Sequence, residues 1–296
     1  MNKSYRTIWN AAKQAHVAAA ETVRSRGKPS GSCKNLVAAA AWMTLGLGAQ
    51  AQTAPAPSTL PTGGQVSAGQ ASVSQNGANM VIQQDSARAA IDWQTFNVGR
   101  DAQVQFKQRD ASSVTLNRVL DSNPSQIFGR ISANGQVVLT NPQGVYFGAS
   151  ARVDVGGLIA TTHDISNDDF MAGDSRLERN DSTGSVVNEG ELKASLGGYI
   201  ALLAPEVRNE GAIIAQMGTV ALAAGEAIDL HFDSDNRLTS IRVEASDIQA
   251  LVENKRAVQA PGGLVIISAQ SMDRLVGGVV KNSGAIEANG LQMKGG

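Results

Sequence analysis

The sequence predicts an all-β protein, namely a right-handed parallel β-helix with an extruded hairpin and loop insertions. Internal repeats are the first observation: residues 187–192 return as 208–213, and 198–204 return as 218–224, shifted by 21 and 20 residues. Related segments come back at 263–269 and 281–286. The runs between turns are short and rich in Val, Ile and Thr, and no stretch after residue 51 has a long helical period. Strands at this constant spacing indicate stacked coils, although a β-sandwich stays an alternative.

Residues 1–51 differ from the rest in charge and are predicted to be an extended signal peptide that is removed. They hold seven Lys or Arg and one acidic residue, whereas the other 245 residues hold 18 basic and 25 acidic ones. The uncharged run 36–48 is too short for a membrane span of about 20 residues and suits a signal-peptide apolar region. Ala49 and Ala51 form a cleavage signal, so the mature chain should begin at Gln52. A buried helix is the alternative for this run.

The beginning of the leader adds a specific resemblance. Met1, Asn2, Lys3, Tyr5, Trp9 and Asn10 match the opening of the extended signal-peptide region found in large exported proteins of Gram-negative bacteria. The resemblance implies passage through the Sec translocon and cleavage by signal peptidase. It also implies either a monomeric autotransporter or a two-partner secretion protein.

The mature chain is expected to hold three parts. Residues 52–62 carry three prolines and form a flexible start, 63–165 form a first β domain, and 166–296 continue the coils. Strands are expected at 65–73, 79–83, 102–108, 113–119 and 136–140, with Val104 and Phe106 facing inward. About nine to eleven coils at about 4.8 Å each would give a rod of roughly 45–55 Å.

Two insertions interrupt the coils, at residues 167–183 and 226–260. In the second, apolar runs at 228–232 and 238–244 flank a turn at 233–236 and predict the extruded hairpin. Residues 247–255 are compatible with one or two helical turns.

Little in the mature chain indicates catalysis. His163 and His231 are expected to be surface or turn residues, and Asp168 with Asp169 is the one paired-carboxylate candidate for acid–base chemistry. Residues 233–236 begin like a calcium loop but lack its following Gly and final Glu. We expect no enzyme, no cofactor and no metal site. The acidic mature chain disfavours nucleic acid, and the lone Cys33 excludes an intramolecular disulfide.

The most informative motif is Asn-Pro-Gln-Gly-Val-Tyr-Phe-Gly at residues 141–148. Asn at the first position, Pro at the second and Gly at the fourth specify a type I turn, with Asn able to cap it. On the residues alone, a tight corner between two strands is sufficient to explain the motif.

At this motif the chain resembles the filamentous haemagglutinin family, specifically its N-terminal secretion domain, also called the two-partner secretion or haemagglutination activity domain. The matching stretches are residues 91–98, 104–106, 116–119, 125–129, 133–137, 141–148 and 155–162. The family hallmark is Asn-Pro-Asn-Gly-Ile, from which Gln143 and Val145 depart. A second motif, Asn-Pro-Asn-Leu, has only a partial echo in residues 123–125, as in the high-molecular-weight adhesin branch.

The resemblance implies a secretion-targeting and β-helix-nucleating domain of a large adhesin-like exoprotein, found at the cell surface or secreted through the periplasm. It implies an outer-membrane β-barrel transporter with POTRA domains as partner, and a receptor on host or neighbouring cells for the complete protein. The secretion-motif residues would be Asn141, Pro142, Gln143, Gly144 and Val145, with Asn117, Arg118, Val119, Asn134 and Gly135 as secondary candidates. An autotransporter passenger and a β-helix polysaccharide-active enzyme are the alternatives.

Overall fold

The computed structural model describes residues 5–10, 15–20, 54–272 and 277–289. The chain divides into two compact units, Met1–Ala51 and Gln52–Gly296. In the first unit, β1 (Tyr5–Asn10) pairs antiparallel with β2 (Ala15–Ala20). The predicted cleavage residues Ala49, Ala51 and Gln52 lie outside the described residues, and cleavage there stays a prediction.

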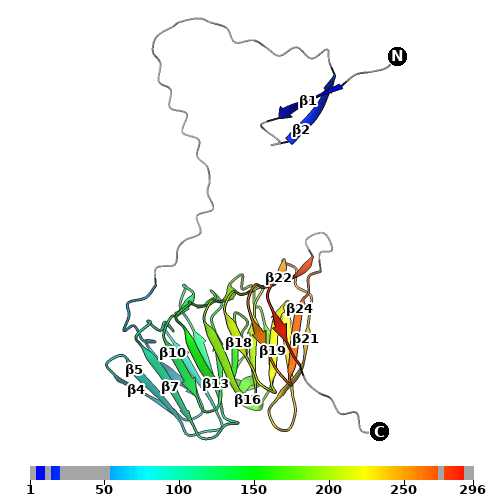
Figure 1. The fold of residues 1–296 in the computed structure, drawn as a ribbon. Helices are drawn as coiled ribbons and strands as arrows, with labels where there is room; N and C mark the ends of the chain where they lie inside the picture. The colour runs from blue at the N-terminus through cyan, green and yellow to red at the C-terminus, as the bar shows by residue number, and fades with distance from the viewer. Residues whose placement is uncertain (1–4, 11–14, 21–53, 273–276, 290–296) are drawn as a thin grey trace, which may run out of the picture. The chain divides into compact units, whose positions relative to one another are not determined.

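The second unit is a parallel β-helix whose strands form three faces (Figure 1). The first face contains β5 (Asn79–Gln84), β7 (Gln103–Gln108), β10 (Arg130–Ala133), β13 (Arg152–Thr161), β16 (Glu191–Leu203), β18 (Ala212–Ile214), β23 (Val258–Gln259) and β26 (Ile286–Glu287). The second face contains β6 (Arg88–Trp93), β8 (Val114–Val119), β11 (Gln136–Thr140), β19 (Thr219–Ala224) and β24 (Leu264–Ala269). β13 and β16 are long enough to belong to both faces.

The third face is a separate six-stranded parallel sheet. It contains β9 (Ser125–Ile127), β12 (Val145–Phe147), β15 (Ser185–Asn188), β17 (Glu206–Asn209), β22 (Ala250–Asn254) and β25 (Gly278–Asn282). At the start of the β-helix, β3 (Gln65–Ala68) pairs antiparallel with β6, and β4 (Ala71–Asn76) pairs antiparallel with β5. These antiparallel strands cover an edge that would otherwise be open to another chain.

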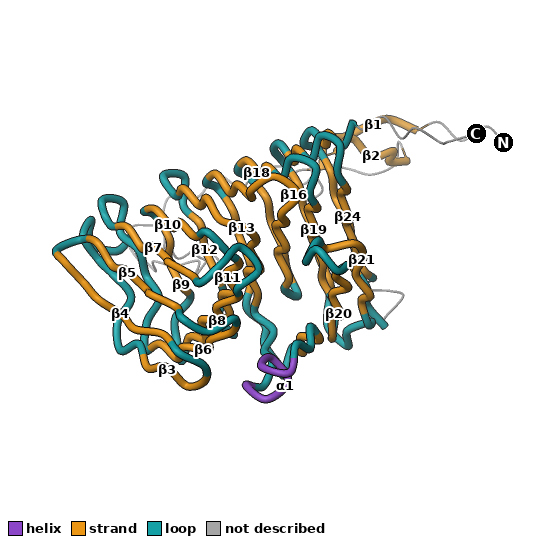
Figure 2. Tube along the Cα trace, turned by 90° about the horizontal axis from the view of Figure 1, so that it is seen from below, coloured by secondary structure: helices purple, strands orange, loops and turns teal. Residues whose placement is uncertain are grey.

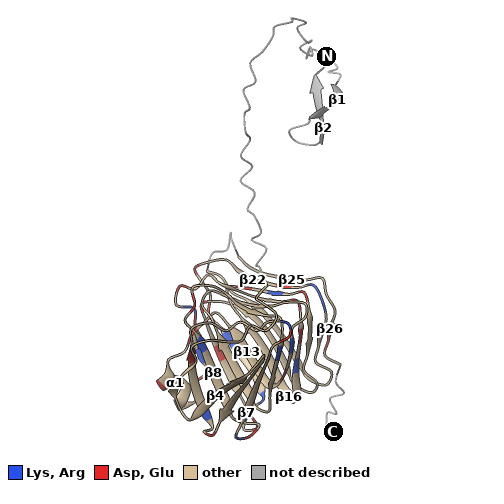
Figure 3. Ribbon diagram, turned by 90° about the vertical axis from the view of Figure 1, so that its left-hand side faces the viewer, with Lys and Arg blue, Asp and Glu red and all other residues tan. Residues whose placement is uncertain are grey.

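The interior is filled by side chains that point inward from all three faces. Val104 and Phe106 are buried, as their alternation with polar residues predicted, and small or aliphatic residues dominate the remaining core. Figure 3 shows charged residues on only a small part of the strands, and no residue of the interior core carries a charge. The narrow tube therefore excludes charge, which explains the low content of charged residues in the sequence, 17%.

The sequence repeats are confirmed as successive coils in register. Val220 pairs with Ile200 on one side and with Val265 on the other. Four asparagines on the third face also stack, and each amide nitrogen donates to the next side-chain oxygen over 2.7–2.8 Å, in the order Asn188, Asn209, Asn254, Asn282. This asparagine ladder satisfies polar groups that are otherwise buried in the turn.

Two expectations about the coils are wrong. Residues 247–255 contain strand β22 instead of helical turns, because Asn254 joins the asparagine ladder and Val252 fills the core. Within the described residues the first face holds eight parallel strands, fewer than the nine to eleven expected coils. The antiparallel strands at the start and the two insertions take up the remaining chain.

The first insertion and the first part of the second leave the β-helix and pack on the outer side of its second face, whereas the rest of residues 226–260 contains β22 and β23, which are strands of the β-helix. The parts that leave the β-helix form what we call the extruded layer: α1 (Asn167–Ala172), β14 (Arg176–Glu178), β20 (Ala227–Phe232) and β21 (Leu238–Val243). β20 and β21 are antiparallel neighbours, which confirms the extruded hairpin, and β14 adds to β20. Figure 2 shows α1 outside the stack of strands. Within the described residues, no helix is both long and apolar enough to cross a membrane.

Candidate functional site

Residues 141–144 form the corner between β11 and β12. The Gly144 N–H donates to the Asn141 carbonyl oxygen over 2.9 Å, which closes the turn that the sequence predicts. The Asn141 side-chain oxygen accepts from the Gln143 N–H over 2.9 Å and caps the same turn. Gly144 has a φ of +125°, a conformation that favours glycine. Each of these motif residues therefore has a local structural role.

The Asn141 side chain also connects its coil to the coil before it. Its amide nitrogen donates to the Asn123 carbonyl oxygen and to the Ser125 hydroxyl, each over 3.0 Å. The Asn141 backbone N–H donates to the Thr161 carbonyl oxygen over 3.0 Å. Asn141 is 0% exposed, and both its side-chain donors and its acceptor have partners. The side chain is thus held by a complete set of buried hydrogen bonds.

The coil after the corner is attached through two further contacts. The Ser182 hydroxyl donates to the Pro142 carbonyl oxygen over 2.6 Å. Val145 lies in register between Ser125 of β9 and Val186 of β15. The corner therefore fastens three consecutive coils of the third face to one another.

Solvent reaches only two residues of the hallmark motif, Pro142 and Gln143. Asn141, Gly144 and Val145 are buried. The Gln143 side chain makes no hydrogen bond to the described residues, so the replacement of the family's second Asn leaves this turn intact. In the folded domain, a partner can touch Pro142 and Gln143 but cannot touch the Asn141 side chain.

The secondary candidates on β8 act inside the fold. The Asn117 side-chain oxygen accepts from the Trp93 indole N–H over 3.0 Å, and its amide nitrogen donates to the Val138 carbonyl oxygen over 3.2 Å. Val119 is part of the interior core. Arg118 forms ion pairs with Asp92 and Asp164, at 3.1 and 3.0 Å. Arg118 therefore fastens the start of the first insertion to the second face.

Asn134 and Gly135 lie at the other end of β11, away from the Asn141 corner. Asn134 exchanges two hydrogen bonds with the Gln108 backbone, over 2.7 and 2.8 Å. The Gly135 N–H donates to the Gln108 side-chain oxygen over 2.9 Å, while the Gln108 amide nitrogen donates to the Gln136 carbonyl oxygen over 2.8 Å. A side chain at position 135 would collide with the Ser113 carbonyl oxygen. These residues organise a second corner, between the first and second faces.

The candidates for catalysis have structural explanations. Asp168 and Asp169 are exposed at the start of α1, where Asp169 exchanges hydrogen bonds with Ser166, the residue that caps the helix. His231 is exposed, as expected. His163, expected at the surface or in a turn, lies in the bend after β13 but not at the surface. His163 is 0% exposed because the base of the second insertion covers it, and its Nε2 lies 3.0 Å from the Gly225 carbonyl oxygen. Burial lowers the pKa of His163 to about 4, against the opposing effect of the Gly225 carbonyl.

The sequence matches two families, each over a long stretch. Residues 57–296 match the family described as TPS (two-partner secretion) secretion domain, and residues 1–50 match the Extended Signal Peptide of Type V secretion system. This chain belongs to the TPS secretion domain family. The chain is thus exported through the periplasm to the cell surface or the medium, and the two matches imply Sec export and a partner transporter. The resemblance stated from the sequence is confirmed.

The TPS domain is similar to proteins from Haemophilus influenzae. A heme/hemopexin-binding protein of strain KW20 Rd is 34% identical over 244 residues, which cover 80% of this chain and 26% of that protein. A second heme/hemopexin-binding protein is 30% identical over 241 residues, covering 73% of this chain and 25% of that protein. The chain thus spans about a quarter of the length of these curated relatives.

A solved structure gives the same fold. The secretion domain of HMW1 from Haemophilus influenzae is 29% identical to this chain and superimposes with a TM-score of 0.69. The match covers 78% of this chain and 60% of that chain.

Sequence reasoning missed the residues that hold the Asn141 side chain. Asn123 and Ser125 belong to the partial echo of the second family motif, and the structure places them directly against Asn141. The sequence Asn-Pro-Ser lies one coil before Asn-Pro-Gln. This similarity could have predicted that the two corners stack on each other. Ser182 gave no such signal, because it lies in a polar insertion whose path the sequence does not determine.

Proposed function

We propose that the corner at residues 141–145 controls how this TPS domain folds as its partner transporter delivers it, and that secretion depends on it. One observation carries the proposal: the buried Asn141 side chain bonds back to Asn123 and Ser125, while Ser182 of the next coil bonds to Pro142. A single short turn therefore sets the stacking of three coils. Residues 117–119 and 134–135 support the β-helix away from this corner.

Folding of a parallel β-helix is limited by the first stacked coils. When two strands are separated by 20 or more residues, the chain between them loses conformational entropy before the strands gain contacts. Their pairing is therefore slow. The bond from Asn141 to Ser125 spans only 16 residues, and the turn itself closes within four. Once these coils are stacked, each later coil adds to an open strand edge. Folding outside the cell would then prevent the chain from sliding back.

The transporter should recognise the chain before it folds. Asn141 is inaccessible in the folded domain, so any contact with its side chain belongs to an unfolded or extended state. We expect the periplasmic POTRA domains of an outer-membrane β-barrel transporter to take up an extended segment as an added strand on a sheet edge.

The activity of the complete exoprotein is a separate matter. Two relatives are named for binding heme or hemopexin, and each is about four times longer than the matched segment. We assign the secretion step to this chain and propose that a receptor on host or neighbouring cells meets the complete, adhesin-like protein. The family favours this function over an autotransporter passenger or a polysaccharide-active enzyme.

Two assays test the proposal. Cells that produce the chain with its partner transporter should release the chain beginning at Gln52 into the medium, and cells without the transporter should not. Purified POTRA domains should retain chain freshly diluted from urea and should not retain chain that has been allowed to refold. Equal retention of folded chain would show that recognition does not require the unfolded state.

A further inference from the structure

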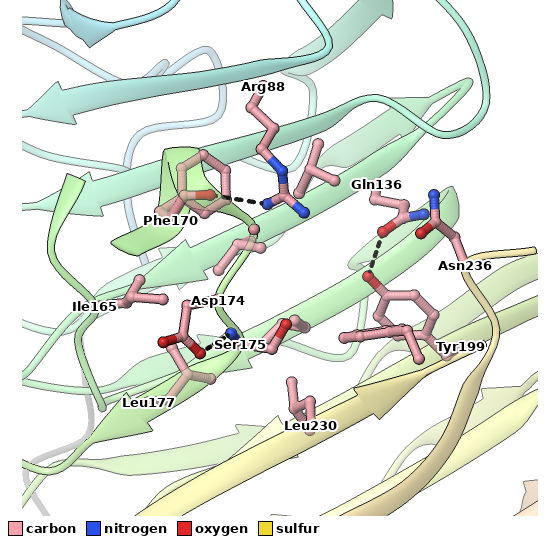
Figure 4. Close-up of a pocket in the computed structure, with 15 residues that line it drawn as sticks. Arg88, Gln136, Ile165, Phe170, Asp174, Ser175, Leu177, Tyr199, Leu230 and Asn236 are labelled. Atoms are coloured by element: carbon pink, nitrogen blue, oxygen red, sulfur yellow. Dashed lines mark hydrogen bonds between the residues drawn. The ribbon is translucent and has the colours of Figure 1, made fainter. Parts of the chain in front are cut away.

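A cavity of about 120 Å³ lies between the second face of the β-helix and the extruded layer. Its walls are mainly apolar: Val138 and Ile159 come from the β-helix, and Phe170, Leu177 and Leu230 come from the extruded layer (Figure 4). An engineered apolar cavity of about 150 Å³ takes up benzene, so this space suits a body the size of one aromatic ring.

Arg88 of β6 lies at this cavity with its charge unpaired. Its guanidinium Nη1 donates to the Phe170 carbonyl oxygen over 3.1 Å, and the group lies 5.1 Å from the centre of the Phe170 ring. Among the described residues, Arg88 is the only Lys or Arg that is not exposed and forms no ion pair. By contrast, Arg118, Arg176 and Arg179 in the same region each bind carboxylates. A partly buried charge without a partner is costly, and a guanidinium has five donors of which one is used here.

The polar lining of the cavity contains one carboxylate and further hydrogen-bond donors. The carboxylate belongs to Asp174, whose Oδ1 accepts from the Ser175 and Arg176 backbone N–H groups over 2.6 and 3.1 Å. The Tyr199 hydroxyl donates to the Gln136 side-chain oxygen over 2.7 Å, and the Gln136 amide nitrogen makes no hydrogen bond to the described residues. Burial lowers the pKa of Arg88 from its ordinary value, while the Tyr199 hydroxyl has the opposite effect. Burial likewise raises the pKa of Tyr199, against the effect of Arg88. The two groups therefore influence each other across one poorly solvated space, where an anion would meet little competition from water.

We propose that this cavity binds a small organic acid with an apolar body, whose carboxylate pairs with Arg88. The planar guanidinium fork matches a carboxylate in two parallel hydrogen bonds, and the apolar walls match an aromatic ring or a short hydrocarbon chain. The bound acid would contact both the β-helix and the extruded layer, and would stabilise their association by mass action. The proposed binding site involves none of the residues of the Asn141 corner, and the proposal does not depend on the proposed secretion function.

The test uses benzoate as the probe and the purified full chain. We expect saturable binding with a dissociation constant of about 1 mM, followed by calorimetry and by a rise in the melting temperature. Benzyl alcohol keeps the ring without the charge, and acetate keeps the charge without the ring. Both should bind about tenfold more weakly or worse. In addition, nuclear Overhauser effects should connect the benzoate ring protons to Phe170 and Leu230.

Matched variants locate the carboxylate. Arg88→Met removes the charge and keeps an apolar stem, and it should weaken benzoate binding about tenfold or more. Arg130→Met removes one exposed positive charge from β10 and should leave binding unchanged. Equal binding of benzoate to Arg88→Met, equal binding of benzyl alcohol, or no saturable binding at about 20 mM would each overturn the proposal. The Overhauser measurement and the comparison with benzyl alcohol need only the unaltered chain, so together they decide the matter even if Arg88→Met fails to fold.

Discussion

Replacement of Asn141 by Asp changes one group of the corner and keeps its shape. The Asp oxygen facing Gln143 can still accept from the backbone N–H, so the turn keeps its cap. The other oxygen takes the place of the amide nitrogen and faces the Asn123 carbonyl oxygen. Both atoms are hydrogen-bond acceptors, so this hydrogen bond is lost. The Ser125 hydroxyl can rotate and donate, which recovers one of the two lost bonds.

The structure sets the size of the effect. A net hydrogen bond contributes about 0.5–1.5 kcal/mol, and a buried acceptor without a partner costs about 1–3 kcal/mol. We therefore expect Asn141→Asp to lower the free energy of unfolding by about 2–4 kcal/mol at pH 7. Asn141→Ala, which also loses the cap, should cost a similar amount.

Urea unfolding of the purified chain measures this effect, and pH separates its causes. Burial raises the pKa of a carboxyl group, and a protonated Asp can donate to Asn123 again. The stability gap between Asn141→Asp and the unaltered chain should narrow as the pH falls from 7 to about 4, whereas the gap for Asn141→Ala should not. A loss below about 1 kcal/mol, or a gap for Asp that does not change with pH, would refute the role assigned to the Asn141 amide.

Three further predictions concern the β-helix. The pKa of His163 is about 4 in the folded chain against an ordinary value of 6.5, so the unfolded chain takes up a proton first as the pH falls. The free energy of unfolding should therefore be highest above pH 6.5 and should decrease by up to about 3 kcal/mol as the pH falls to about 4. Urea midpoints across this range should show the decrease, and His163→Gln should make it smaller. Asn209→Ala in the middle of the asparagine ladder should cost about 2–4 kcal/mol, whereas Asn282→Ala at its exposed end should cost less than about 1 kcal/mol in the same assay. Gly218→Ala should cost about 2 kcal/mol or more in thermal unfolding, because its Cβ would overlap the Gly198 carbonyl oxygen of the coil before; a wild-type melting temperature would contradict that close stacking.

The regular coils could be predicted from the sequence because equivalent positions of successive repeats pair with each other. Asn188 and Asn209 recur with the same neighbours, and the structure pairs them directly. Asn254 is part of the same ladder, but the second insertion separates it from the repeat and hid the match of Val-Glu-Asn to the earlier units. A local sequence match predicts a coil only where the spacing of 20 or 21 residues between repeats is kept.

The candidate site was predicted in part. The turn at 141–144 follows from its own residues, since Asn, Pro and Gly each favour that geometry locally. Its partners Asn123, Ser125 and Ser182 depend on which coils stack, and this is a long-range property. The burial of His163 is of the same kind, because an insertion about 60 residues later covers it.

Secretion by two variants of similar expected stability shows whether the corner itself controls release. Asn141→Asp alters the corner, and Leu222→Ala alters the buried core of a later coil, at a cost of about 2–5 kcal/mol in the same range. Both are produced together with the partner transporter, and the chain in the medium is compared with the chain in the periplasm. If the corner controls secretion, Asn141→Asp should be released about fivefold less than Leu222→Ala, because a slow nucleus leaves the chain to periplasmic proteases. Equal release of the two variants would contradict the account and reduce the corner to a stable turn.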